Sequence, residues 1–180
     1  MYLGLTFTKN LRWNNHIDQV SIKARKRLSA MMPLKFKINR QSLEIMYKSF
    51  VMPVLEYGLI VWGGTYNTDI LKLERIQLDA LRLISGATAR SSMAAVYKET
   101  SFVSIRERID YLSLVMLYRI KNDLSPDYLK CLLPADNTEV IHYNLRNNRN
   151  IKLPFSRLES FRRSFFPRAI RLWKALSLKI

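Results

Sequence analysis

The sequence predicts a mainly α-helical protein with a short β-hairpin at its N-terminus. Residues with good helix propensity fill long runs of the 180-residue chain, which has only 5 glycines and 6 prolines. Within these runs, apolar residues recur at the three- and four-residue spacing of amphipathic helices. We therefore expect a helical bundle over residues 14–134. It lies between a hairpin at residues 1–13 and a basic loop with a C-terminal amphipathic helix at residues 135–180.

The first residues have the composition of a β-hairpin. Residues 2–7 include good strand formers, Lys9 and Asn10 fit a turn, and residues 11–13 can form a second strand. A two-stranded ribbon alone is marginally stable in water. We therefore expect this hairpin to be the edge of a larger structure.

The next segment has the pattern of a long amphipathic helix. Asn14 or Asn15 is predicted to cap it, and it runs to about Met32, before Pro33. One side of this helix carries the apolar stripe, and the opposite side carries a basic face. No acidic residue lies among the basic residues at 23–27, so this face can bind phosphate groups or simply be solvated.

The most apolar stretch, residues 47–64, is predicted to be the central element of the core. Glu56 is its only charged residue between residues 50 and 62, and Asn39 is predicted to cap the helix that leads into it. Pro53 predicts a kink or a local break in that helix. The residues expected on one broad apolar face are Leu43, Tyr47, Phe50, Val51, Val54 and Leu55.

Capping and termination signals place the later helices. Thr68 is a predicted cap, Gly86 a predicted stop, and Ser104 with Glu107 has the form of a capping box. These signals predict helices over residues 68–84, 91–98, 104–121 and 125–133. Beyond them we expect a polar loop at 137–150, an extended segment at 151–155 and a final helix at 164–176.

The final helix is predicted to be amphipathic and basic. We expect Phe165, Ala169, Leu172, Trp173 and Leu176 to face inward, and Arg168, Arg171 and Lys174 to face outward. Such a helix can also lie on a membrane surface. Without a lipidation signal, and without about 20 consecutive apolar residues, we expect no membrane partner.

Positive charge is concentrated towards the two ends of the chain. The net charge is +16, and residues 9–40 hold 9 basic residues and one acid, while residues 146–179 hold 10 basic residues and one acid. Clustered positive charge is typical of proteins that bind nucleic acid. The candidate nucleic-acid-binding residues are Lys23, Arg25, Lys26, Arg27, Arg162, Arg163, Arg168 and Arg171, and Trp13 is the best candidate for base stacking.

The sequence has few groups suited to other chemistry. His16 and His142 are the only histidines, and neither has a metal-ligand partner at the usual spacing. The single cysteine, Cys131, cannot form an internal disulfide, which favours an intracellular protein. No phosphate-binding glycine loop is present. We expect no cofactor, metal or small-molecule ligand in this chain.

Several stretches, taken in order, resemble the reverse transcriptases of LINE-type, jockey-like non-LTR retrotransposons. The order and spacing of the matching residues carry the resemblance more than any single motif. The matching residues are 2–4, 11–13, 16–17, 23–24, 27–28, 47–49, 53–58, 61–62, 73–77, 80–82, 84–86 and 164–173.

The resemblance implies a position behind the catalytic palm of such a polymerase. Tyr2, Leu3 and Gly4 look like the primer-grip hairpin, and the following helices look like the thumb, which holds the primer–template duplex. The family uses Mg²⁺ held by palm carboxylates, but its Phe/Tyr-x-Asp-Asp signature is not in this sequence. We therefore expect a fragment, inactive alone as an RNA-directed DNA polymerase, whose partners are an RNA–DNA or DNA duplex and the missing palm and fingers.

A second hypothesis belongs to a different class of protein. The chain can instead be a helical protein-interaction remnant of a degenerate retroelement, with an apolar surface around Leu3, Leu5 and Phe7. Association that grows with protein concentration at high salt favours this hypothesis. Salt-sensitive duplex binding favours the first.

Overall fold

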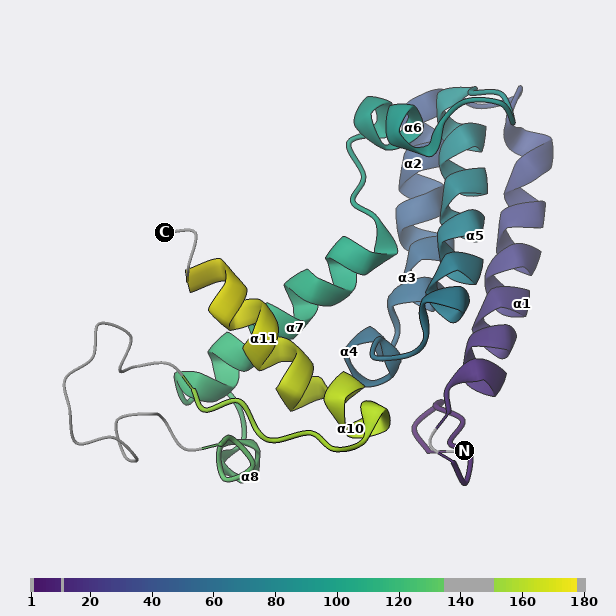
Figure 1. The fold of residues 1–180 in the computed structure, drawn as a ribbon. Helices are drawn as coiled ribbons and strands as arrows, with labels where there is room; N and C mark the ends of the chain where they lie inside the picture. Colours follow the sequence, from purple (N-terminus) through teal and green to yellow (C-terminus); the bar gives the residue numbers. More distant parts are fainter. Residues whose placement is uncertain (1, 11, 135–150, 178–180) are drawn as a thin grey trace. The chain divides into compact units, whose positions relative to one another are not determined.

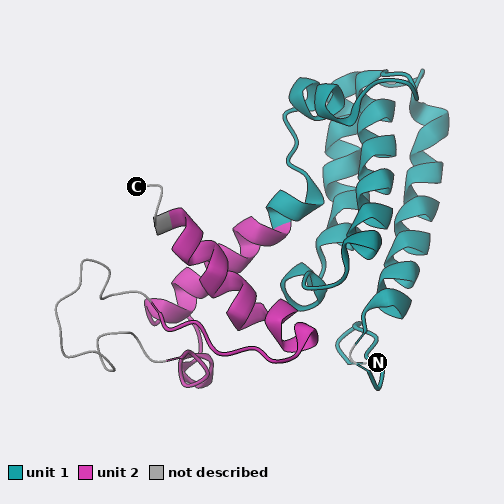
Figure 2. Ribbon diagram, in the orientation of Figure 1, with its two compact units in different colours: residues 1–108 teal, residues 109–180 magenta. Residues whose placement is uncertain are grey.

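The computed structural model describes residues 2–10, 12–134 and 151–177, and this part of the chain is mainly helical, as predicted (Figure 1). It forms two compact units, residues 1–108 and 109–180 (Figure 2). The helices that begin in unit 1 are α1 (Asn14–Met31), η1 (Met32–Leu34), α2 (Arg40–Met46), η2 (Tyr47–Val51), α3 (Met52–Glu56), α4 (Leu59–Trp62), α5 (Asn67–Ser85), α6 (Met93–Thr100) and α7 (Ile105–Lys121). Unit 2 holds the rest of α7 with α8 (Asp127–Lys130), α10 (Glu159–Arg163) and α11 (Phe165–Ser177). The domain boundaries at residues 13 and 134 stay predictions.

Unit 1 is built on three helical rods that lie side by side: α1, α5, and the rod formed by α2, η2 and α3 (Figure 1). Each rod contributes an apolar stripe to a shared core. Its largest fully buried side chains include Ile17 from α1, Tyr47 from η2 and Leu73 from α5. Burying side chains of this size stabilises the unit by about 1.5–3 kcal/mol each. The polar face of α1 is left on the outside.

The middle rod is interrupted at Pro53 in the way its sequence predicts. Residues 47–51 form the π-helix η2, which passes into α3 next to the proline. The buried residues of this rod and the next helix are four apart: Leu43, Tyr47, Val51, Leu55 and Leu59. In a regular helix of 3.6 residues per turn, a row of residues four apart turns gradually around the helix axis. The wider turn of η2 reduces that rotation and keeps the row on the core.

Three helix boundaries follow the predicted signals closely. The side chain of Asn39 accepts a hydrogen bond from the Ser42 amide at 2.8 Å, so it caps α2. Ser104 and Glu107 form the capping box, with the Ser104 amide donating to Glu107 at 2.8 Å and the Glu107 amide donating to Ser104 at 3.2 Å. Gly86 ends α5 with a φ of +74°. Local sequence determines these three boundaries.

Two predicted caps are wrong. Neither Asn14 nor Asn15 caps α1, because Trp13 occupies the cap position without a side-chain hydrogen bond. Thr68 lies inside α5, whose cap position is held by Tyr66. In both cases the helix begins earlier than expected.

The predicted N-terminal hairpin is not found. In the described residues of this segment, pairing is limited to one isolated bridge in which Tyr2 and Leu5 exchange two backbone hydrogen bonds of 2.9 Å. Leu3 and Gly4 form the turn between them, both with positive φ. Residues 6–10 and 12–13 then lead to α1 without a strand, with a turn at Lys9 and Asn10. Strand propensity alone could not exclude the tight turn at Leu3 and Gly4, because Gly4 tolerates the left-handed conformation.

Unit 2 has a small core of its own. Leu117, Ile151, Ala169 and Ile170 are buried together, and Trp173 packs against them. The predicted final helix is confirmed as α11, but α10 was not predicted. Leu176, expected to face inward, is 48% exposed. The predicted loop at 137–150 lies outside the described residues.

Candidate nucleic-acid interface

The α1 cluster, defined as Lys23, Arg25, Lys26 and Arg27, lies in the second half of α1. Lys23, Arg25 and Lys26 are exposed, and Arg27 is half-buried. Between them, Ala24 faces the core and is fully buried. The sequence therefore placed this basic surface correctly relative to the apolar stripe.

The acidic side chains of unit 1 are already engaged by other groups. Asp18, the one acid on α1, pairs with Lys72 at 2.8 Å, and Lys72 also pairs with Asp69 at 3.2 Å. The other engaged acids are Glu44, Glu56, Glu74, Asp79, Glu99 and Glu107. By contrast, Lys23, Arg25 and Lys26 have no hydrogen bond or ion pair to any described side chain. Their charge is free to bind an external anion.

Arg27 is held in place by the middle rod. Its Nη1 atom donates to the backbone oxygen of Phe50 at 2.6 Å, and its guanidinium carbon lies 4.9 Å from the centre of the Phe50 ring. Because Phe50 both accepts this hydrogen bond and lies against the guanidinium, it fixes Arg27 against η2. Sequence reasoning found Arg27 but missed Phe50, which was expected in the core and is 41% exposed. The only feature of the local sequence that pointed to an irregular helix at Phe50 was the nearby Pro53.

The Tyr2-Leu3-Gly4 turn packs against Tyr57 and Gly58, which belong to another of the stretches that resemble jockey-like polymerases. The Tyr57 hydroxyl donates to the Leu3 backbone oxygen at 2.7 Å, and its ring lies against Gly4. Gly58 has a φ of +66°, and a Cβ there would lie 2.9 Å from Leu5. Two short motifs that are far apart in the sequence therefore form one corner of unit 1.

Trp13, the predicted stacking residue, is packed among other rings. It makes edge-to-face contacts with Phe7 at 5.1 Å and with His16 at 6.2 Å, and His16 in turn contacts Trp62 at 5.8 Å. The amide of Thr6 donates to His16 Nδ1 at 3.4 Å. Burial lowers the pKa of His16, and the charge of Lys23 lowers it further. Trp13 is thus a half-buried part of this row of rings.

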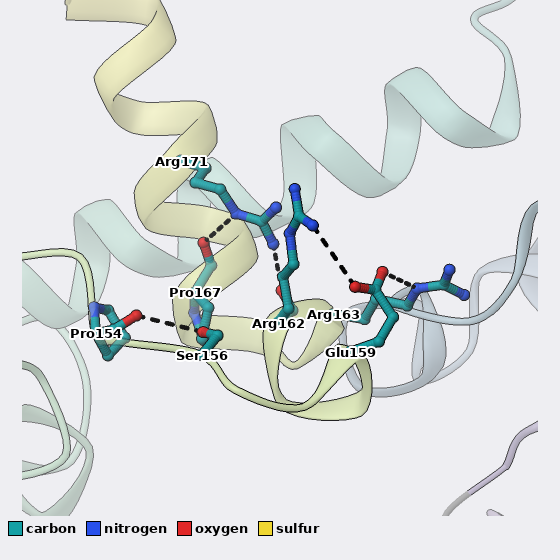
Figure 3. Close-up of polar contacts among 7 residues, drawn as sticks. All are labelled: Pro154, Ser156, Glu159, Arg162, Arg163, Pro167 and Arg171. Carbon is teal, nitrogen blue, oxygen red and sulfur yellow. Dashed lines mark hydrogen bonds and ion pairs between the residues drawn. The ribbon is translucent and has the colours of Figure 1, made fainter.

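The C-terminal arginine cluster, defined as Arg162, Arg163, Arg168 and Arg171, lies on α10 and α11 of unit 2. Figure 3 shows Glu159 between two of these arginines, pairing with Arg163 at 2.9 Å and with Arg162 at 3.7 Å. The hydrogen bond from Arg163 lowers the pKa of Glu159. Arg171 donates to the backbone oxygens of Arg162 and Pro167 (Figure 3). Sequence spacing did not reveal that one carboxylate already engages this cluster.

Arg168 does not face outward as expected. Its Nη2 atom donates to Ser113 Oγ on α7 at 3.1 Å, and Ser113 is fully buried. Desolvation lowers the pKa of the Arg168 guanidinium, although the charge of Asp110 opposes this effect. Arg168 therefore supports the packing of α11 on α7.

In the ranges that the structure describes, no group of three or more His, Cys, Asp or Glu side chains is arranged to hold a metal ion. No helix among the described residues is long and apolar enough to span a membrane.

The relatives of this chain are RNA-directed DNA polymerases of mobile elements, to which it is homologous over part of its length. It is 35% identical over 89 residues to the RNA-directed DNA polymerase from mobile element jockey of Drosophila melanogaster, a match that covers 48% of this chain and 10% of the relative. The jockey polymerase of Drosophila funebris is 34% identical over 89 residues, with the same coverage. The probable polymerase from transposon X-element of Drosophila melanogaster is 20% identical over 112 residues, covering 61% of this chain and 12% of the relative.

These relatives confirm the resemblance to jockey-like elements. The chain spans about a tenth of the length of the curated relatives it matches. No protein-family model matches it, and no solved structure matches it.

Proposed function

We propose that this chain holds a primer–template duplex through phosphate contacts made by the α1 cluster. One observation carries the proposal: Lys23, Arg25 and Lys26 are exposed and unpaired among the described residues, while the acids of unit 1 are engaged elsewhere. An uncompensated row of cations on one helix is the electrostatic footprint of a polyanion partner. The C-terminal arginine cluster supplies further phosphate contacts through Arg162 and Arg171.

The relatives supply the chemical class of the partner. They are named as RNA-directed DNA polymerases, and copying RNA into DNA produces an RNA–DNA hybrid. The Asp-Asp signature of the polymerase palm is not in this sequence. The role proposed for this chain is therefore to hold the duplex, and catalysis is assigned elsewhere.

Recognition of this kind depends on charge and shape. Lysine and arginine side chains bind backbone phosphates and release counterions, which makes affinity fall steeply with salt. Such contacts position the duplex without reading its bases, and an A-form hybrid is recognised mainly by its shape and backbone. We therefore expect similar affinity for duplexes of unrelated sequence.

A salt titration tests the proposal directly. A fluorescently labelled RNA–DNA hybrid is titrated with the full chain, and its anisotropy is followed at several salt concentrations. A steep negative slope of log affinity against log salt supports several phosphate contacts. Binding that is weak or independent of salt would contradict the proposal. The net charge of +16 would then not serve to bind nucleic acid.

A protein partner is the second candidate, favoured by the apolar corner at the N-terminus. Tyr2 is 69% exposed, Leu3 72% and Tyr57 57%, and these three residues adjoin one another through the docked turn. Leu5, expected to belong to this exposed surface, is instead buried. Molecular mass that rises with protein concentration at high salt would favour this candidate. A monomer that does not bind duplex would count against both.

A further inference from the structure

Phe50 is an exposed aromatic residue directly beside the α1 cluster. Phe50 is 41% exposed although its neighbour Val51 is fully buried. The guanidinium of Arg27 lies 4.9 Å from the centre of the ring, and the same residue's backbone oxygen accepts a hydrogen bond from Arg27. The charge is thus fixed near the ring of a residue that is still partly exposed to solvent.

Arg27 keeps donors available in this position. A guanidinium has five N–H groups, and Phe50 accepts from one of its nitrogens. Lys23 precedes Arg27 by four residues and Lys26 by three, so Lys23 is the neighbour of both on the surface of α1. The surface therefore presents phosphate-binding donors next to an aromatic ring.

Cationic donors beside an aromatic ring match two parts of a nucleotide, the phosphate and the base. Proteins that hold single strands combine a basic surface for the backbone with aromatic side chains on which bases stack. Inside a duplex, neighbouring base pairs already cover the base faces. An aromatic ring can therefore stack only on a terminal base or on an unpaired one.

We propose that Phe50 stacks on an unpaired base at the end of a duplex whose phosphates contact the α1 cluster. The inference rests on the proposed duplex binding and adds a preference for a junction between paired and unpaired nucleotides. It also replaces Trp13, which is packed against Phe7 and His16, as the stacking residue. Stacking tolerates any base, so the preference is structural and independent of sequence.

The experiment compares a blunt RNA–DNA hybrid with the same hybrid carrying a short single-stranded overhang that contains 2-aminopurine. Anisotropy measures affinity, and 2-aminopurine fluorescence reports stacking. The variants of the full chain are Phe50→Leu, which removes the aromatic face, and Phe50→Tyr, which keeps it. Phe36→Leu is the matched control, because Phe36 is 92% exposed and has a lysine nitrogen 5.5 Å from its ring.

We expect the wild-type chain to bind the overhang hybrid about five- to tenfold more tightly than the blunt one. Phe50→Leu should lose this preference, while Phe50→Tyr and Phe36→Leu should retain it; the readout is the ratio of the two affinities, because Phe50→Leu also removes the ring on which Arg27 stacks. The inference is overturned if Phe50→Leu keeps the preference, if Phe36→Leu loses it equally, or if the wild-type chain has none while binding both hybrids. Absence of salt-dependent binding to the blunt hybrid would instead overturn the duplex proposal itself, and this inference with it.

Discussion

Neutralising two lysines of the α1 cluster tests the duplex proposal with little risk to the fold. The variant Lys23→Gln/Lys26→Gln removes two charges that are three residues apart on one helix, and glutamine has nearly the same helix propensity as lysine. Both side chains are exposed and make no contact that the core depends on. We expect the free energy of unfolding to change by less than about 0.5 kcal/mol.

The size of the effect follows from counterion release. Each phosphate contact adds about −0.9 to the slope of log affinity against log salt for a B-form duplex. Loss of two contacts should make the slope less negative by about 1.8. Raising the salt from about 50 mM to about 200 mM should then weaken wild-type binding about 12-fold more than it weakens binding of the variant.

The assay is the anisotropy titration with two labelled duplexes of unrelated sequence. Its matched control is Arg90→Gln/Lys98→Gln, which removes the same charge from exposed residues in and next to α6 of unit 1. The control should change the slope much less, because it alters only the overall field. Equal slope changes in both variants, or a change for one duplex sequence alone, would refute the assignment to α1.

Three further outcomes follow from the structure. Gly58→Ala should lower the free energy of unfolding by about 2 kcal/mol, because it places a Cβ against Leu5 at a left-handed backbone position. Gly86→Ala should lower it by only about 1 kcal/mol, because its Cβ would meet no atom within 4 Å. Urea denaturation of the two variants measures the difference. His16 has a lowered pKa in the folded state, so stability should be full above the unfolded pKa of about 6.5 and fall as the pH drops below it. In His16→Gln that fall should disappear from denaturation curves at pH 7.5 and 5.5. Glu159→Gln should strengthen duplex binding and steepen its salt dependence, because it removes the carboxylate that occupies two arginines; unchanged binding would mean that the C-terminal arginine cluster makes no phosphate contact.

Helix signals that act over three or four residues were readable from the sequence. Asn39, Gly86 and the Ser104–Glu107 box each mark a boundary through contacts with their own neighbours. The basic face of α1 was predictable for the same reason, because helical periodicity alone separates it from the apolar stripe. These features depend on local geometry and not on how helices pack.

Features set by distant residues could not be predicted. Strand propensity favoured a hairpin at the N-terminus, but the turn at Leu3 is held by the Tyr57 hydroxyl, 54 residues further along the chain. Periodicity placed Arg168 in solvent, yet it donates to Ser113 on another helix. Phe50 was assigned to the core because a regular helix was assumed through a segment that is a π-helix. Each difference comes from tertiary contacts or from a change in helix type.

The π-helix also restricts how the length of this segment can change. A π-turn closes its hydrogen bonds one residue further along than an α-turn does, so it can be regarded as a one-residue insertion in an α-helix. Deleting one residue from 47–51 should therefore turn η2 into a regular α-helix without rotating the residues that follow it. Leu55 and Leu59 would then stay on the face that they share with Leu43. An added residue would instead rotate everything after it by about 100°, so this segment should tolerate a one-residue deletion better than a one-residue insertion.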